Sequence, residues 1–380
     1  MFNLLYWLLG FLRMSTGGLT AQAFGRGDRD ECLTVLTRSM IISTAIGLLF
    51  ILLSGSLGYL LLQFIDPDEP TRSLAGSYFA ICIWGAPATL GMYVLTGWFI
   101  GMQSTKIPMW VSIFINLVNI PLSLLLVYPL DMGIRGAAIG TLTAQWSGFL
   151  LGAFICLRRF RPRWTGWSAI LRRQHLGRLF KINTDLFLRT LCMVAVTLWF
   201  TRVGARYGAV TLAANALLMQ LFTLFSYFMD GFAFAGEALC GRFKGAGDHR
   251  ALAAAVRGVL TCGGILAILF TILYTVAGQE ILALLSNDGE VLEGSSEYFW
   301  WAVSIPLAGF AAFAWDGIVT GTSNTRLMLL STGVASLFFF AVWWLTYPIL
   351  GNHGLWLAFV LYLLVRGLVL TFAAGRHTKI

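Results

Sequence analysis

Long apolar segments alternate with short polar connectors along the whole chain. Runs without a charged residue cover positions 39 to 65, 73 to 105, 107 to 130, 136 to 157, 258 to 279 and 327 to 365. A helix that crosses a bilayer needs about 20 apolar residues, so each run is long enough to cross and the longest must hold two spans. The pattern predicts an all-α polytopic membrane protein.

Dividing the long runs at glycine, proline or charged positions predicts eleven spans. Their expected centres lie near residues 14, 52, 88, 118, 147, 193, 220, 265, 310, 338 and 363. The composition agrees, since 58% of the 380 residues are hydrophobic and 11% are charged. Soluble proteins carry about 25% charged residues.

The basic residues are distributed unevenly between the two sets of connectors. One side holds Arg26, Arg29, Arg38, Lys106, Arg158, Arg159, Arg161, Arg163, Arg172, Arg173, Arg178, Lys181, Arg242, Lys244, Arg250, Arg326, Arg376 and Lys379. The other side holds Arg72, Arg135, Arg202 and Arg206. The positive-inside rule makes the first side cytoplasmic. The net charge of +9 could suggest a nucleic-acid partner in a soluble protein, but here the distribution of the charge matters more than its sum and reports the topology. We expect a multi-pass protein of a bacterial-type inner membrane, with no nucleic-acid partner.

An internal repeat with a constant offset of 220 residues relates the two halves of the chain. The matched positions are Gly25 to Asp28 with Gly245 to Asp248, Tyr78-Phe79 with Tyr298-Phe299, Gly97 with Gly317, Gly101 with Gly321, and Thr105-Lys106 with Thr325-Arg326. Both halves keep the same sidedness, which predicts a parallel repeat. We expect an N-lobe at residues 1–157, a basic cytoplasmic linker at 158–177 and a C-lobe at 178–380.

The repeat gives the span near residue 193 no counterpart in the first half. Adding that helix would complete a fold of six plus six helices. We therefore expect an upstream segment of roughly 40 residues, as the length of the missing helix requires.

Five segments carry a resemblance to a known family. They are Phe11–Gly25 (FLRMSTGGLTAQAFG), Asn119–Leu122 (NIPL), Gly133–Gly136 (GIRG), Asp185–Thr190 (DLFLRT) and Asp230–Glu237 (DGFAFAGE). With them the chain resembles the multidrug and toxic compound extrusion (MATE) transporters, particularly the DinF-like branch. The resemblance covers family helices 2–6 in the N-lobe and 7–12 in the C-lobe, and lacks the first helix.

This resemblance implies a V-shaped, two-lobe transporter that works by alternating access as a monomer. Its substrates would be cationic amphiphilic drugs, exported in exchange for H⁺ or Na⁺, with membrane lipid as its surroundings and no other cofactor. Proton-coupled relatives usually carry a key acid on the first helix, which is absent here. A second position that can be acidic in relatives is Ser123 in this chain.

Charged side chains inside the spans are the candidates for ion coupling, because charge in the membrane interior is costly and usually functional. The candidates are Asp316, Asp185, Asp230, Glu237 and Arg189. Asp185 and Arg189 are four residues apart and are expected to pair on one helix face. Asp316 has no basic residue three or four positions away, and by resemblance it matches an acidic ligand of sodium-coupled relatives, so Na⁺ near Asp316 is one hypothesis.

Each of these candidates also has a structural alternative. The Asp185 and Arg189 pair fits a static ion pair, and Asp316 fits a buried hydrogen bond between helices. Glu237 fits a hydrated position near a helix end. Two further span residues, Arg13 and Arg366, are charged without an assigned role.

Uncharged polar and aromatic side chains in the first half are the candidates for the substrate cavity. They are Asn119, Gln22, Asn116, Tyr93, Trp84 and Gln145. Aromatic faces attract organic cations, and amides orient ligands. The same residue types tie helices together or pack at interfaces, which is the alternative interpretation.

The sequence does not predict an enzyme. The histidines at 175, 249, 353 and 377 are in or next to separate connectors, the cysteines show no CxxC spacing, and no phosphate-binding GxxxxGK[ST] loop is present. Two other functions stay open: a lipid-linked oligosaccharide flippase of the same superfamily, or a truncated remnant that does not transport. A flippase would be expected to carry a more basic interior than Arg13, Arg189 and Arg366 provide.

Overall fold

The computed structural model describes residues 2–65, 68–161, 166 and 173–377. These residues are almost entirely helical and include no strand. The chain divides into two compact units, Met1–Phe180 and Lys181–Ile380. The boundary between them falls within one helix, α10.

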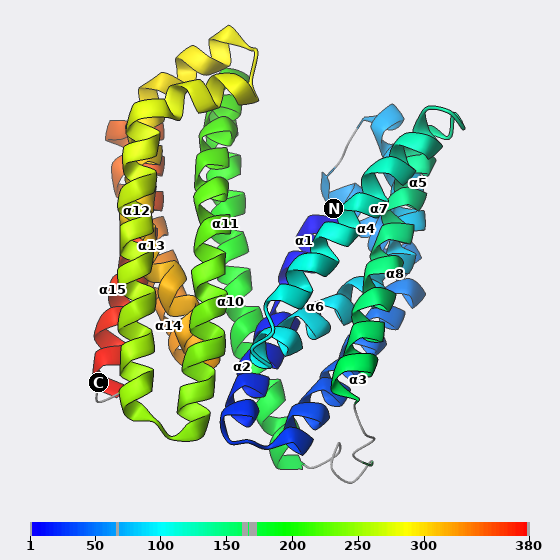
Figure 1. Cartoon of the computed structure of the whole chain (residues 1–380). Coiled ribbons are helices and arrows are strands. Elements are labelled where there is room, and N and C mark those ends of the chain that lie inside the picture. The colour runs from blue at the N-terminus through cyan, green and yellow to red at the C-terminus, as the bar shows by residue number, and fades with distance from the viewer. Residues whose placement is uncertain (1, 66–67, 162–165, 167–172, 378–380) are drawn as a thin grey trace. The chain divides into compact units, whose positions relative to one another are not determined.

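Unit 1 is a bundle of helices in which long spans alternate with shorter pieces (Figure 1). Its elements are α1 (Phe2–Leu8), α2 (Phe11–Gly25), α3 (Arg29–Leu52), α4 (Ser54–Ile65), α5 (Glu69–Cys82), the 3₁₀ helix η1 (Ile83–Gly85), α6 (Ala86–Gly101), α7 (Lys106–Val127) and α8 (Gly133–Phe160). The 3₁₀ turn leads into the first turn of α6, where Pro87 lacks the N–H that would continue a regular helix from α5.

Unit 2 consists of long helices joined by short turns (Figure 1). They are α10 (Arg173–Arg206), whose first residues belong to unit 1, α11 (Ala209–Ala246), α12 (His249–Leu285), α13 (Gly289–Gly321), α14 (Thr325–Leu350) and α15 (Asn352–His377). Pro306 lies inside α13 without ending that helix.

Ten helical segments within the described part of the chain are long and apolar enough to cross a membrane. The expected span near residue 14 corresponds to α1 and α2, which are separate at Gly10 and individually short. The expected centre near residue 52 was wrong, because α3 ends at Leu52. This helix starts earlier because it buries the polar residues Arg38, Ser39 and Ser43 on its inner side, so the polar sequence belongs to the span.

The repeat is visible in the backbone of one turn in each unit. Gly27 and Gly247 have positive φ angles of 74° and 72°. In each unit the next residue, Asp28 or Asp248, accepts a hydrogen bond at 2.9 Å from the backbone N–H three residues on. A carboxylate at this position caps the first turn of the following helix, so both halves start a helix by the same device.

The repeat is equally visible where two helices cross. A Cβ added to Gly97 of α6 would collide with the carbonyl oxygen of Arg13 in α2, and one added to Gly317 of α13 would collide with that of Ala233 in α11. Arg13 and Ala233 are themselves related by the offset of 220. Each unit is therefore built on an equivalent close crossing.

One turn further along, Gly101 and Gly321 repeat this relation. A Cβ on Gly101 would strike the backbone of α2, and one on Gly321 would strike the backbone of α11 at equivalent residues. The turns that follow also match, since Gln103 and Ser323 adopt positive φ angles of 59° and 54°. These paired geometries confirm the internal repeat.

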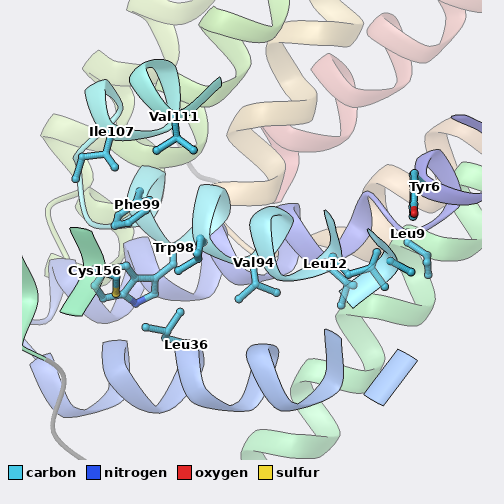
Figure 2. Packing of buried hydrophobic residues seen from close by; sticks show 13 residues of the cluster. Tyr6, Leu9, Leu12, Leu36, Val94, Trp98, Phe99, Ile107, Val111 and Cys156 are labelled. Carbon is cyan, nitrogen blue, oxygen red and sulfur yellow. The ribbon is translucent and has the colours of Figure 1, made fainter. Parts of the chain in front are cut away.

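The core of unit 1 lies between α2, α3, α6 and the end of α8. Figure 2 shows Trp98 of α6 beside Cys156, with Leu36 reaching toward them from α3. The Trp98 indole N–H donates to the backbone oxygen of Cys32 at 2.9 Å, and its ring meets Phe160 edge-on at 4.8 Å between centroids. The buried indole therefore has a packing partner for its ring and a hydrogen-bond acceptor for its N–H.

Large apolar side chains remain exposed on the outer faces of the helices. The most apolar 18-residue stretch of α7 has a mean hydropathy of 2.0, and only 6% of it is buried. Leu117 and Trp110 on this helix are each more than 60% exposed. A surface of this kind requires contact with lipid, which agrees with a multi-pass membrane protein.

The glycine crossings lead to a stability prediction. We expect Gly317→Ala to lower the melting temperature in detergent, because overpacking a helix crossing costs about 1–3 kcal/mol. Gly333→Ala in α14 is the matched control, since nothing lies within 4 Å of its added Cβ. Equal melting temperatures for the two variants would contradict the close crossing.

Candidate functional site

Three charged side chains from three helices meet inside unit 2. Asp316 of α13 accepts hydrogen bonds at Oδ2 from Nη2 of Arg189 in α10 and from Nη2 of Arg366 in α15, the latter at 2.5 Å. Their side chains are 13%, 7% and 1% exposed, respectively. We call Asp316, Arg189 and Arg366 the charge cluster.

The charge cluster is closely packed but not fully hydrogen-bonded. Oδ1 of Asp316 and the Nε atoms of Arg189 and Arg366 are buried without a hydrogen-bond partner. One carboxylate cannot neutralise two guanidinium groups, and Asp230 supplies a further negative charge within electrostatic range of Arg189. The cluster therefore depends on the charge of Asp316, because protonating it would leave two buried arginines poorly paired.

Neighbouring contacts hold the α13 segment in position. The indole N–H of Trp315 donates to Thr371 of α15 at 2.9 Å, which fixes α13 against α15 beside Asp316. The Thr320 hydroxyl donates to the backbone oxygen of Asp316 at 2.7 Å. Gly317 follows Asp316 directly and faces α11. Asp316 thus lies between two residues that hold α13 close to α15 and α11.

The expected pairing of Asp185 with Arg189 was wrong. Arg189 binds Asp316 across helices, and Asp185 accepts a hydrogen bond at 2.8 Å from Thr325 of α14. An ion pair at this spacing on one helix gives only about 0.2–0.5 kcal/mol. A buried carboxylate on another helix competes successfully for the guanidinium, because leaving that carboxylate unpaired is more costly.

Asp230 and Glu237, both on α11, differ in their environment. Glu237 is 1% exposed, so it is not a hydrated residue at a helix end. Asp230 is half-buried and acts electrostatically on Arg189. Asp230 therefore belongs near the charge cluster.

At the end of α11, Lys244 donates to the backbone oxygen of Thr322 at 2.6 Å.

The candidates in unit 1 are divided among different contacts. Gln22 is buried and accepts a hydrogen bond from Arg178 at 2.8 Å. Asn119 of α7 donates to the hydroxyl of Thr141 in α8 at 3.3 Å. Asn116 is exposed and donates to the carbonyl of Ser112 in its own helix.

The remaining three candidates lie on or beside α6. Gln145 packs against Gly85, where an added Cβ would strike its side-chain oxygen. Trp84 is 57% exposed, and its backbone oxygen accepts from the indole of Trp146. Tyr93 is half-buried and packs against the core of unit 1.

Two residues that contact the candidate acids had no assigned role from the sequence. Arg366 was recognisable as a charge within an apolar span, but its partner Asp316 lies on another helix. Thr325 gave no signal beyond its place in the repeat. Among the described residues, no group of three or more histidine, cysteine or acidic side chains is arranged to hold a metal ion.

The chain matches known proteins in sequence and in structure. The family model for MatE matches residues 1–125 and 186–345. The chain is 35% identical over 379 residues to the DNA damage-inducible protein F of Escherichia coli K12, covering 99% of this chain and 82% of that protein. It is 26% identical over 387 residues to the probable multidrug resistance protein NorM of Rhizobium meliloti, covering 93% and 79%.

A solved structure described as MATE in the bent conformation matches with a TM-score of 0.89 at 17% identity, covering 100% of this chain and 85% of that chain. This similarity shows the fold. Together with the apolar spans and the sequence matches, it places the chain among the multi-pass membrane transporters. The chain belongs to the MatE family, the multidrug and toxin extrusion transporters, and its expected DinF-like character agrees with the relative from Escherichia coli. Members of this family are transporters and not enzymes.

The charge cluster leads to an ordered set of stabilities. We expect Asp316→Asn to lower the free energy of unfolding by about 3–5 kcal/mol, because it leaves two buried guanidinium groups without a carboxylate. Arg366→Gln should cost less, since Arg189 still pairs with Asp316. Melting temperatures in detergent would measure both losses. The control is Glu280→Gln, which removes an exposed carboxylate of α12. A larger loss for Arg366→Gln would contradict this account.

Proposed function

We propose that the protein is a secondary active antiporter that exports cationic amphiphilic compounds in exchange for H⁺ or Na⁺ by alternating access. The observation that carries the coupling is the charge cluster, in which one carboxylate holds arginines from two other helices. In this proposal, the carboxylate of Asp316 couples ion binding to transport and also stabilises unit 2.

Coupling requires that ion binding changes how helices are held together. Ionised Asp316 joins α13 to α10 through Arg189 and to α15 through Arg366. Neutralising the carboxylate would weaken both contacts together, because each is a charge-assisted hydrogen bond. In this proposal, ion binding at Asp316 loosens the bundle of unit 2, and ion release restores it.

The contacts of Asp316 favour a proton over sodium. A proton needs one oxygen, and Oδ1 of Asp316 is buried without a partner. Hard metal cations are held by several oxygen ligands, whereas the neighbours that bind Oδ2 are two guanidinium groups. Sodium would have to displace at least one arginine. Asp230, Glu237 and Asp185 remain proposed participants in the same unit.

The substrate class and the setting follow the family. The NorM relative is named as a probable multidrug resistance protein, which supports export of drugs by this chain. Asn119, Gln22, Asn116, Tyr93, Trp84 and Gln145 remain proposed cavity residues. We propose lobes at residues 1–157 and 178–380 around a basic linker at 158–177, in a bacterial inner membrane with the basic connectors cytoplasmic, and a monomeric state.

Flipping of lipid-linked oligosaccharides is not favoured. The family match is to MatE, and the buried arginines of unit 2 are already engaged by Asp316. A pyrophosphate carrier would instead need cationic groups available for its ligand. Drug export is therefore the better-supported function.

Transport into inside-out membrane vesicles tests the coupling. We expect ethidium uptake by the wild type under an imposed outward proton gradient, and at least a tenfold loss in Asp316→Asn. Glu280→Gln, which removes an exposed carboxylate, should behave like the wild type. Parallel vesicles with a sodium gradient identify the ion.

Gradient-free exchange of ethidium separates coupling from loss of folded protein. Asp316→Asn should retain this exchange when normalised to the amount of folded protein. Full gradient-driven uptake by Asp316→Asn would remove Asp316 from the coupling mechanism. Absence of ethidium transport by the wild type under both gradients would count against drug export itself.

A further inference from the structure

A small pocket lies where α2 ends, α3 begins and α10 starts, entirely within unit 1. It is lined by Leu19, Arg26, Glu31, Val35, Arg38, Arg178 and Leu179. Its volume of about 20 Å³ admits a group of the size of one or two water molecules. We call it the arginine pocket.

The arginine pocket carries more positive than negative charge. Three of its lining residues are arginines, and Glu31 is its single carboxylate among the described lining residues. Arg38 is 3% exposed and its Nη1 lies 3.4 Å from Oε1 of Glu31. Arg26 and Arg178 are exposed at the pocket, and Arg178 also donates to Gln22.

This charge is not needed to build the helical hairpin. The equivalent hairpin of unit 2, between α11 and α12, forms the same glycine turn and the same aspartate cap. At the positions of Arg26, Glu31 and Arg38, unit 2 has Ala246, Ala251 and Gly258. Unit 2 thus forms the same turn and cap without these charges, so the turn and cap do not depend on them.

The chemistry of the arginine pocket fits a phosphate group. Guanidinium groups bind phosphate oxygens through paired hydrogen bonds, which a lone ammonium cannot match. The pocket admits about one oxygen, and Arg26 and Arg178 at its edge supply further guanidinium donors, although Arg178 is partly engaged with Gln22. Leu19, Val35 and Leu179 form an apolar wall beside this polar group.

The location also fits a membrane headgroup. Arg26 precedes the span that starts at Arg29, so the pocket lies at the edge of a membrane helix. It lies on the side that carries most of the arginine and lysine residues, where basic pockets between helices bind anionic lipid headgroups. We propose that the arginine pocket binds a phosphate group, presented by an anionic phospholipid or by free phosphate. This site is independent of the coupling role of Asp316.

Binding to the purified full chain in detergent tests the proposal. The probes are short-chain phosphatidylglycerol, short-chain phosphatidylcholine and sodium phosphate, and the readout is the apparent dissociation constant from thermal-shift titrations. The test variant is Arg26→Gln/Arg178→Gln. The control variant is Arg250→Gln/Arg257→Gln, which removes two exposed arginines from the equivalent region of α12.

We expect phosphatidylglycerol to bind the wild type more tightly than phosphatidylcholine. The test variant should lose about fivefold in affinity for each arginine removed, and the control variant should keep wild-type affinity. Glu31→Gln should bind about fivefold more tightly, because it removes the negative charge and keeps an acceptor for Arg38.

The source of the phosphate is read from the two anionic probes. Loss of phosphatidylglycerol binding in the test variant, without competition by sodium phosphate, identifies a lipid. If the test variant loses sodium phosphate binding, and the wild type binds phosphatidylglycerol and phosphatidylcholine equally, the ligand is free phosphate. Equal losses in the test and control variants, or no tightening in Glu31→Gln, would overturn the proposal, since general surface charge would then explain the binding.

Discussion

The close crossing of two helices, made possible by glycine, is the constraint on which each unit depends. Gly97 lets α6 approach α2, and Gly317 lets α13 approach α11. Within a bilayer, lipid tails are as apolar as leucine side chains, so helices associate mainly through close packing of small residues. Without these crossings, the flanking side chains would lose their neighbours. Asp316 illustrates this dependence, because its position beside Gly317 fixes where its carboxylate meets the two arginines.

The apolar pattern was sufficient to predict the class of fold. Runs without charge set the spans, and the offset of 220 residues set the repeat, which the caps at Asp28 and Asp248 then confirmed. The pattern placed α3 incorrectly because the buried Arg38 looks like the end of a span. Periodicity reports the average environment of a helix, and it does not identify single polar residues that are buried with partners.

The candidate site was less accessible to sequence reasoning. Asp316 was recognisable as a charge in a span, but spacing along one helix assigned Arg189 to Asp185 instead. The true partners of Asp316 are Arg189 of α10 and Arg366 of α15, which are far from it in the chain. Only the packing of the helices determines which charges meet. The local rule is outweighed here because Asp316 meets two arginines that are themselves buried, and a buried guanidinium left without a carboxylate is costly.

The duplicated hairpin has a consequence for how such a protein can change. The cap and the turn are shared by both copies, whereas Arg26 in one corresponds to Ala246 in the other, and Asp316 corresponds to Thr96. The backbone scaffold and the electrostatics are thus separable properties. Each half repeats one architecture, so the charges of one half can change over evolution while the turn and the cap that both halves share stay the same.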